Sequence, residues 1–389
     1  MSPFFAPIRT TRSFNDDLQS LHDVLVAGKL SGTADIVNSY ELKLAERFGS
    51  KYCLALSSGS TAIHVALHVA GVDRSKEVIV PATAPVPSVL PILCLGATPV
   101  FTDTAEGSFG LDVADVERKL TARTAAVLTV PLYGYPQDYD ALLKLLVPRG
   151  IPLVEDAAQA HGATLSSRTV GSLGLIGCFS THDNKFISTG EGGFLVTNSE
   201  SHYEAAKSFA RLGGLDGINE GYNFKLAALA AGLGQNRLKY LDEILVARRE
   251  RAAYIKRALS HLDLAEISIP DDGCPNYYAL VFRVEPNKYD GRKIREFLHS
   301  EGVESDFIRY GYTCAYYRPI FSQFFRDHCV NAENFLQSLI TLPTHPGISN
   351  AIVARLQEKL SAALLMEGRH FNLLGSDCDR SLSSRIARS

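Results

Sequence analysis

The chain has 389 residues, of which 46% are hydrophobic and 21% charged, and this usage excludes a disordered, collagen-like or coiled-coil protein. Lysine and arginine number 39 against 42 aspartate and glutamate residues, which gives a formal net charge of −3. Because there is no basic excess, neither nucleic acid nor an anionic membrane is an expected partner. We expect a small-molecule substrate or another protein chain.

The seven cysteines are scattered along the chain, and no two have the CxxC spacing of a metal or redox site. This pattern predicts neither a disulfide framework nor a bound metal, and it suits a reducing compartment. The N-terminal segment lacks the apolar run of a secretory signal. The apolar run at 87–97 is broken by proline and glycine and is too short to span a bilayer. We therefore expect a cytoplasmic protein.

The first 15 residues predict an irregular arm, followed by helices over about 16–27 and 39–48, the second ending at Gly49. From about 52 to 200, short apolar runs alternate with amphipathic stretches such as 60–70 and 139–146. Continuous apolar strands separated by helices indicate an α/β fold with a mostly parallel sheet covered on both faces. In such sheets ligands bind beyond the C-terminal ends of the strands. The predicted strands are Glu77–Val80, Thr98–Asp103, Ala125–Val130, Pro152–Glu155, Gly177–Ser180 and Gly193–Thr197.

Residues 225–259 predict a long helical region, in which Gly232 and Gly234 argue against one straight helix. After it, 277–284 is strand-like and 290–300 and 332–340 are helical, which is typical of a smaller α+β domain. The tail is rich in serine, arginine and aspartate, and this composition favours disorder. We divide the chain into an arm (1–15), a large domain (16–240), a small domain (241–366) and a tail (367–389).

The most informative stretch is 180–193, STHDNKFISTGEGG. Lys185 follows one apolar strand and precedes a glycine turn that leads into another. Desolvation between buried strands depresses the pKa of an ammonium group, and a neutral amine can form a Schiff base with a carbonyl compound. A lone lysine is nevertheless more often a solvated loop residue, so this stretch alone leaves both interpretations open.

The second stretch is 153–162, LVEDAAQAHG, in which Asp156 ends an apolar strand. A carboxylate there is well placed to pair with a protonated ring nitrogen of a cofactor, but it would equally suit a helix N-cap. Gln159 lies within reach of the same ligand, or is a surface amide. His161 is more often a packed histidine than a catalytic base.

The third stretch is 56–67, LSSGSTAIHVAL, which predicts a strand, a Gly/Ser turn and the start of a helix. Free backbone N–H groups at a helix N-terminus, together with the hydroxyls of Ser60 and Thr61, form an anion site that would fit a phosphate. A plain serine-capped helix explains the same pattern equally well. The turn is neither a Walker loop nor a GxGxxG motif.

In this order and spacing, the three stretches resemble the DegT/DnrJ/EryC1/StrS aminotransferases. The resemblance covers about residues 8–365, and its most specific part is EDAAQAHG, then S-x-x-x-x-K, then GEGG. It implies a fold-type I enzyme that depends on pyridoxal 5'-phosphate, with 16–240 as the cofactor-binding domain. Other matching segments are VIVPATA (78–84), VPLYGYPQDYDAL (130–142), GYNFKLAALAAGLGQ (221–235) and LPTHPG (342–347).

The resemblance also implies roles for single residues. Lys185 matches the lysine to which the cofactor is covalently attached, Asp156 the carboxylate at the pyridine nitrogen, and Gln159 the residue near the phenolic oxygen. Asn223 matches an asparagine that reaches the cofactor phosphate of the neighbouring subunit, which implies a homodimer with shared sites. The residues that match the phosphate cup are Gly59, Ser60, Thr61 and Ser180.

Several positions depart from the family pattern. Pro85 stands where members carry an aromatic residue that stacks on the cofactor ring, and aromatic stacking contributes about 0.5–1.5 kcal/mol in protein pairs. Ala228 and Ala230 replace a carboxylate and a glutamine, and Thr181 replaces an aromatic residue. These changes bear on substrate scope more than on cofactor binding. Dehydratase members carry histidine where this chain has Lys185, so the lysine favours transamination.

The resemblance implies transfer of an amino group from glutamate or glutamine to a keto sugar, often nucleotide-linked, or to a keto cyclitol. Two alternatives remain open: a family enzyme with an unusual acceptor or with cofactor chemistry other than transamination, and a non-catalytic dimeric scaffold. Intact Lys185, Asp156 and Gln159 argue against the scaffold. The acceptor-side candidates, each of which would also suit a packing or interface role, are Tyr133, Lys225, Tyr310, Tyr312, Tyr316, Tyr317 and Arg318.

Overall fold

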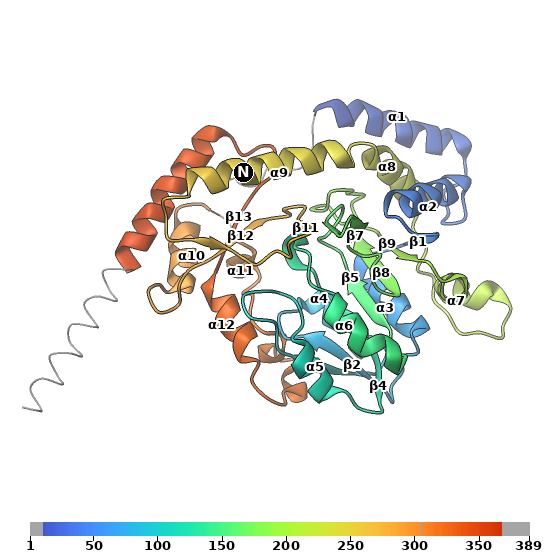
Figure 1. Ribbon diagram of the computed structural model, residues 1–389. Helices are drawn as coiled ribbons and strands as arrows, with labels where there is room; N and C mark the ends of the chain where they lie inside the picture. The colour runs from blue at the N-terminus through green and yellow to red at the C-terminus, as the bar shows by residue number, and fades with distance from the viewer. Residues whose placement is uncertain (1–10, 304, 368–389) are drawn as a thin grey trace, which may run out of the picture.

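A seven-stranded sheet forms the centre of the molecule (Figure 1) in a computed structural model that describes residues 11–303 and 305–367. Strand β9 is antiparallel to both of its neighbours, and the other strands all run in one direction. The sheet is therefore mostly parallel, as predicted. In spatial order the strands are β1 (Tyr52–Leu56), β9 (Gly193–Thr197), β8 (Ile176–Ser180), β5 (Leu153–Asp156), β4 (Thr124–Thr129), β2 (Glu77–Pro81) and β3 (Thr98–Thr102).

Helices cover both faces of this sheet, which explains why its strands are continuously apolar. In β2, Val78 and Val80 belong to one core cluster and Ile79 to another on the opposite face. The first face is covered by α3 (Gly59–Val69), α4 (Val86–Cys94) and α7 (Glu200–Ala210). The second is covered by α5 (Val113–Lys119) and α6 (Asp140–Leu146). A two-sided α/β core is thus built by the alternation of side chains along each strand.

Three helices pack together beside β1: α1 (Thr11–Ala27), α2 (Asp35–Arg47) and α8 (Ala228–Leu238). Helix α1 begins at Thr11, so residues 11–15 are helical and not part of the irregular arm that the sequence predicts. A Cβ atom added to Gly232 would lie 2.6 Å from the Val24 side chain, and one added to Gly234 would lie 2.6 Å from the Tyr40 ring. The two glycines therefore permit close packing of α8 on its neighbours, within a regular helix.

The helical region expected at 225–259 is two helices, α8 and α9 (Leu241–Ala258), and Figure 1 shows α9 running across the upper part of the molecule, below α1. Beyond it, β10 (Ala265–Glu266), β12 (Leu280–Arg283) and β13 (Leu339–Leu342) form a small antiparallel sheet. Its helices include α10 (Gly291–Ser300), α11 (Asp306–Arg309), α12 (Val330–Ser338) and a helix at 350–367. The helix expected at 332–340 ends at Ser338, because the next residues pair with β12.

A third, short sheet joins the two parts of the chain. Strand β11 (Gly273–Cys274) pairs with β6 (Thr164–Leu165), which in turn pairs with β7 (Arg168–Thr169). The tail at 368–389 and most of the expected arm lie outside the described residues. Among the residues that are described, no helix has both the length and the apolar character needed to cross a membrane.

Candidate active site

Asp156 ends strand β5 beside the neighbouring parallel strand β8, from which the Lys185 turn leaves. The carboxylate is only 5% exposed; Ser88 Oγ of α4 donates to Oδ2 at 2.5 Å, and the Ala158 N–H donates to Oδ1 at 3.1 Å. Burial raises the pKa of Asp156, although both hydrogen bonds and the charge of Lys185 lower it. A buried carboxylate with a nearby amine is therefore placed at the end of the sheet where ligands bind.

Lys185 is half-buried in the turn between β8 and β9. At the base of this turn, the Thr181 N–H donates to Gly192 O at 2.8 Å and the Thr189 N–H donates to Thr181 O at 2.7 Å. The hydroxyl oxygens of Thr181 and Thr189 lie 2.7 Å apart in a hydrogen bond. The threonine that replaces the family's aromatic residue at 181 thus closes the base of the lysine turn.

The N-terminus of α3 lies against the end of β8. Ser58 caps the helix, since its Oγ accepts from the Thr61 N–H at 3.0 Å. A Cβ atom added to Gly59 would lie 2.7 Å from Ser180 Cβ, so only glycine allows this approach. Ser60 is exposed and Thr61 is half-buried. The four residues of the predicted phosphate cup are therefore brought together at a helix N-terminus, which favours a bound anion.

Gln159 lies three residues beyond Asp156, and its Oε1 accepts from the Tyr133 N–H at 2.7 Å. Its amide NH₂ is consequently the group that can donate to a phenolic oxygen. Tyr133 is buried with a φ of 54°, a conformation that L-residues rarely adopt. Asn276 of the C-terminal part donates from Nδ2 to Gln159 O at 2.9 Å and to His161 O at 3.0 Å. The C-terminal part thus holds the backbone of Gln159 directly, through a hydrogen bond to its carbonyl.

His161 is packed in an aromatic cluster, with ring centroids 6.0 Å from Phe48 and 5.2 Å from Phe179. Burial, followed by the charge of Lys185, lowers the pKa of His161 to about 3. The ring is therefore neutral at ordinary pH. This matches the structural role that the sequence favoured over that of a base.

Asn223 and Lys225 lie on the segment that passes β1 on its way to α8. Asn223 is exposed, and its Oδ1 accepts from Lys225 Nζ at 2.5 Å. The backbone of Lys225 bridges to Leu56, and Gly32 leaves room for its side chain, because a Cβ at Gly32 would lie 2.4 Å from Lys225 Cβ. Ala228 is buried and begins α8, where its N–H donates to Leu30 O at 3.1 Å.

The other acceptor-side candidates lie in the segment 310–318, and they divide into two groups. Tyr312 donates its hydroxyl to Thr83 O at 2.5 Å, and the Ala315 N–H donates to Ala82 O at 2.7 Å, so this segment contacts the loop after β2. Tyr310 is 54% exposed, and its carbonyl accepts from Arg318 Nη2 at 2.6 Å. Tyr316 and Tyr317 instead donate to Glu333 at 2.6 and 2.9 Å.

Sequence reasoning missed three side chains that the structure adds to the site. Ser88 has no motif of its own, but it follows Pro85, whose carbonyl accepts from the Ser88 N–H at 2.9 Å as α4 begins. Tyr278 places its ring centroid 4.9 Å from Lys185 Nζ, and Phe186 stacks on Tyr278 with centroids 5.9 Å apart. Tyr278 had only one sequence signal, its place in an expected strand.

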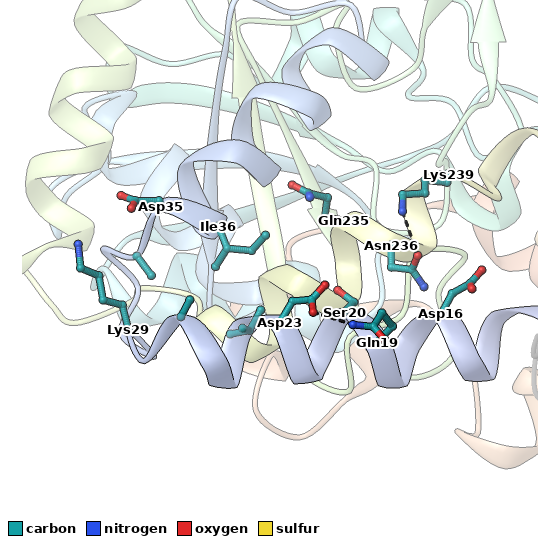
Figure 2. Close-up of a pocket in the computed structure, with 13 residues that line it drawn as sticks. Asp16, Gln19, Ser20, Asp23, Lys29, Asp35, Ile36, Gln235, Asn236 and Lys239 are labelled. Atoms are coloured by element: carbon teal, nitrogen blue, oxygen red, sulfur yellow. Dashed lines mark hydrogen bonds between the residues drawn. The ribbon is translucent and has the colours of Figure 1, made fainter.

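A separate cleft of about 540 Å³ lies between α1, α2 and α8 (Figure 2). Within its wall, Gln19 Nε2 donates to Asp23 at 2.7 Å and Lys239 Nζ donates to Asn236 at 3.3 Å. None of the residues that line it, in the part of the chain described, belongs to the Lys185 site. The charged lining residues are of both signs: Asp16, Asp23, Lys29, Asp35 and Lys239.

Comparison with known proteins matches this geometry to one family. A model of the DegT/DnrJ/EryC1/StrS aminotransferase family matches residues 12–361. GDP-perosamine synthase of Escherichia coli O157:H7 is 28% identical over 364 residues, covering 92% of this chain and 98% of that protein. L-glutamine:scyllo-inosose aminotransferase of Streptomyces griseus is 32% identical over 312 residues, covering 75% and 74%.

Among solved structures, S. venezuelae DesV, determined in complex with a ketimine intermediate, superposes with a TM-score of 0.82. It is 26% identical in sequence, and the match covers 90% of this chain and 94% of that one. The sequence motifs, the mostly parallel sheet and the family match agree along most of the chain. The chain belongs to the DegT/DnrJ/EryC1/StrS aminotransferase family.

Proposed function

We propose that this aminotransferase binds pyridoxal 5'-phosphate at the Lys185 site and transfers an amino group from glutamate or glutamine to a keto sugar or keto cyclitol. The observation that carries the proposal is the placement of two groups: Asp156 is a buried carboxylate at the end of β5, and Lys185 lies in the turn that leaves the neighbouring parallel strand β8. The charge of Lys185 lowers the pKa of Asp156. The names of the relatives, a GDP-perosamine synthase and a scyllo-inosose aminotransferase, support this acceptor class.

The residues present fit this cofactor. The Asp156 carboxylate is buried and its pKa is raised, so a cationic ring nitrogen would offset the cost of its burial. The start of α3 and Ser180 lie close together because Gly59 has no Cβ, and in the cradle that they form a phosphate would meet the positive end of the helix. Lys185 supplies the amine to which an aldehyde attaches. When bound, the cofactor would supply an electron sink for the α-carbon of the amino donor.

Each side chain then has a task. Asp156 would keep a positive charge at the ring nitrogen of the bound cofactor, and Ser88 orients the carboxylate. Lys185 Nζ would take the proton from the α-carbon of the donor and deliver it within the same site. Gln159 Oε1 accepts from the Tyr133 N–H, which leaves its Nε2 to donate to the phenolic oxygen when the cofactor is bound. We propose Tyr133, Lys225, Tyr310, Tyr312 and Arg318 as acceptor-side groups. Tyr316 and Tyr317, the other two candidates, are held by hydrogen bonds to Glu333.

The proposal includes a homodimer, because Asn223 is exposed and would reach the cofactor phosphate of a second copy. The carbonyl of its neighbour Phe224 accepts from the Ser57 N–H at 2.8 Å, close to the start of α3. It also takes 16–240 as the cofactor-binding domain and 241–366 as the small domain. Analytical ultracentrifugation should give a dimer. An Asn223→Ala protein that still dimerises should lose affinity for the cofactor.

The test is an absorbance spectrum of the purified protein with pyridoxal phosphate, before and after L-glutamate, beside Lys185→Ala. We expect a visible band that depends on Lys185 and converts to the pyridoxamine form with glutamate. A band that no amino donor bleaches would instead favour other cofactor chemistry, and would direct attention to Pro85, Ala228 and Ala230. Absence of any band would contradict the proposal and favour a scaffold. Screening keto sugars and keto cyclitols for regeneration of the band would then identify the acceptor.

A further inference from the structure

An aromatic ring from the C-terminal part of the chain lies beside the amine of the lysine turn. Lys185 Nζ is 4.9 Å from the centroid of the Tyr278 ring. The residue next to the lysine, Phe186, stacks on the same tyrosine with an interplanar angle of 23°. The tyrosine ring is therefore in contact with two consecutive residues of the turn between β8 and β9.

Hydrogen bonds fix both the N–H and the carbonyl group of Tyr278. Its N–H donates to Asn276 Oδ1 at 2.9 Å and to Tyr133 O at 3.0 Å. Its carbonyl accepts from Arg248 Nη1 at 3.1 Å. Arg248 is itself only 4% exposed, and its guanidinium lies 4.5 Å from the centroid of the Phe186 ring. The same arginine thus contacts both Tyr278 and the residue that follows Lys185.

A lysine side chain has many rotamers, and it stays in one of them only when an attractive contact holds its terminal amine. The face of an aromatic ring attracts an ammonium group within about 6 Å of its centroid, and the attraction is stronger where water is excluded. The Tyr278 ring lies within this distance of Lys185 Nζ. The backbone of Tyr278 cannot move without breaking its hydrogen bonds to Asn276, Tyr133 and Arg248.

We propose that Tyr278 is a positioning residue: its ring holds the protonated Lys185 amine in one place whenever that amine is not joined to a cofactor. The inference rests on the proposed function, since it gives this contact a use in turnover. During each cycle the amine becomes an ammonium group when it takes the proton from the donor α-carbon, and the ring face would then hold it in the place from which it delivers that proton. The contact itself exists in the cofactor-free protein and is measurable there.

Two variants separate the ring from the hydroxyl. Tyr278→Phe keeps the ring, whereas Tyr278→Leu removes it and leaves an apolar side chain. Tyr203→Leu is the matched control, because Lys207 Nζ lies 5.3 Å from the Tyr203 ring in a lysine–tyrosine pair on α7. Lys185→Arg identifies the signal of Lys185 in the first measurement.

The first measurement is the ¹³C NMR spectrum of the cofactor-free full chain after reductive dimethylation of its lysines. A ring current displaces methyl groups that lie over a ring face. We expect a displaced Lys185 signal in the wild type, in Tyr278→Phe and in Tyr203→Leu, and its return to the position of an exposed dimethyl-lysine in Tyr278→Leu. An undisplaced signal in the wild type, or one that Tyr278→Leu leaves in place, would overturn the proposal.

The second measurement is the rate at which saturating L-glutamate bleaches the band of the protein loaded with pyridoxal phosphate. We expect Tyr278→Leu to be slower by roughly 2- to 30-fold, which is the range of cation–π energies, with little change in the glutamate concentration at half-maximal rate. Tyr278→Phe should stay within about twofold. Equal slowing by both variants, or none by Tyr278→Leu, would contradict the proposal. If the wild type shows no response to glutamate, the proposed function fails, and the NMR result still decides the contact.

Discussion

Ser88 and Asp156, 68 positions apart in the sequence, share a buried hydrogen bond with 2.5 Å between Ser88 Oγ and Asp156 Oδ2. The serine lies in the first turn of α4 and the aspartate at the end of β5. The hydroxyl lowers the pKa of a carboxyl that burial raises. It therefore favours the charged form that a cationic ring nitrogen needs.

Replacing Ser88 by alanine tests this relationship. Without the hydroxyl the pKa of Asp156 should rise further, and the carboxylate should hold a ring cation less well. Hydrogen bonds to charged groups contribute about 1.5–3 kcal/mol, so we expect the glutamate half-reaction to slow roughly tenfold or more. Stopped-flow absorbance measures it. Ser338→Ala, which removes another buried hydroxyl far from the site, should leave the rate unchanged.

Asp156→Asn should separate stability from chemistry. Between the unfolded and the folded pKa of Asp156, the folded state binds more protons, so the carboxylate makes folding less favourable as pH rises through that window. At neutral pH the asparagine protein without cofactor should be as stable as the wild type or more so in urea denaturation. Its activity should fall roughly 100- to 1,000-fold, the usual cost of removing a preorganised electrostatic group. A less stable but active variant would contradict this assignment.

Gly59→Ala should weaken cofactor binding by steric exclusion. The new Cβ would lie 2.7 Å from Ser180 Cβ, so α3 and β8 must separate at the cradle. We expect the Kd for pyridoxal phosphate, from fluorescence titration, to rise about tenfold, which corresponds to about 1.4 kcal/mol. Ser180→Gly removes the clashing atom together with a hydroxyl of the phosphate cup, so the effect of Gly59→Ala is compared in both backgrounds. We expect Gly59→Ala to raise the Kd less in the Ser180→Gly protein than in the wild type, and an equal rise in both would show that the close approach is not the cause.

His161→Leu should change the acid sensitivity of the fold. The pKa of His161 in the folded protein is lowered to about 3. Below about pH 6.5 the histidine is therefore protonated in the unfolded chain but stays neutral in the folded protein. Its contribution to stability is complete above that pH and is lost as pH falls. Between pH 7.5 and 5.5 the wild type should lose about 1 kcal/mol more stability than the variant in urea denaturation. Asp156 and Glu155 are present in both proteins, so their effect on stability cancels when the two losses are subtracted.

Local patterns in the sequence were sufficient to predict β2, β3, β4, β5, β8 and β9 of the seven-stranded sheet, because each is a continuous apolar run between turn residues. They also placed Asp156, Ser180 and Lys185 near strand ends, and parallel strands bring such ends together. Other features depend on contacts far apart in the chain. No helix is predicted from the sequence at 86–94, where α4 lies; Pro87 occupies its first turn, where a missing N–H costs little.

The residues that the sequence did not reveal are those supplied by distant elements. Ser88 and Tyr278 carry no motif, and only tertiary packing places them at Asp156 and Lys185. Likewise, Gly232 and Gly234 weaken a helix by propensity, but Val24 and Tyr40 occupy the space that their side chains would need. Helix propensity depends on the local sequence, so it contains no information about residues that are distant in the chain and packed against the helix in the folded protein.

The carboxamide of Asn276 also determines how the site can move. A Cβ at Gly134 would lie 1.7 Å from Asn276 Oδ1, so this side chain sits directly on the backbone of the large part. Its Nδ2 holds the carbonyls of Gln159 and His161, on either side of Ala160. Swinging the C-terminal part away would break these bonds together and disturb Gln159 at the same moment. We therefore expect substrates to reach Gln159 without a rotation of the C-terminal part away from the rest of the chain.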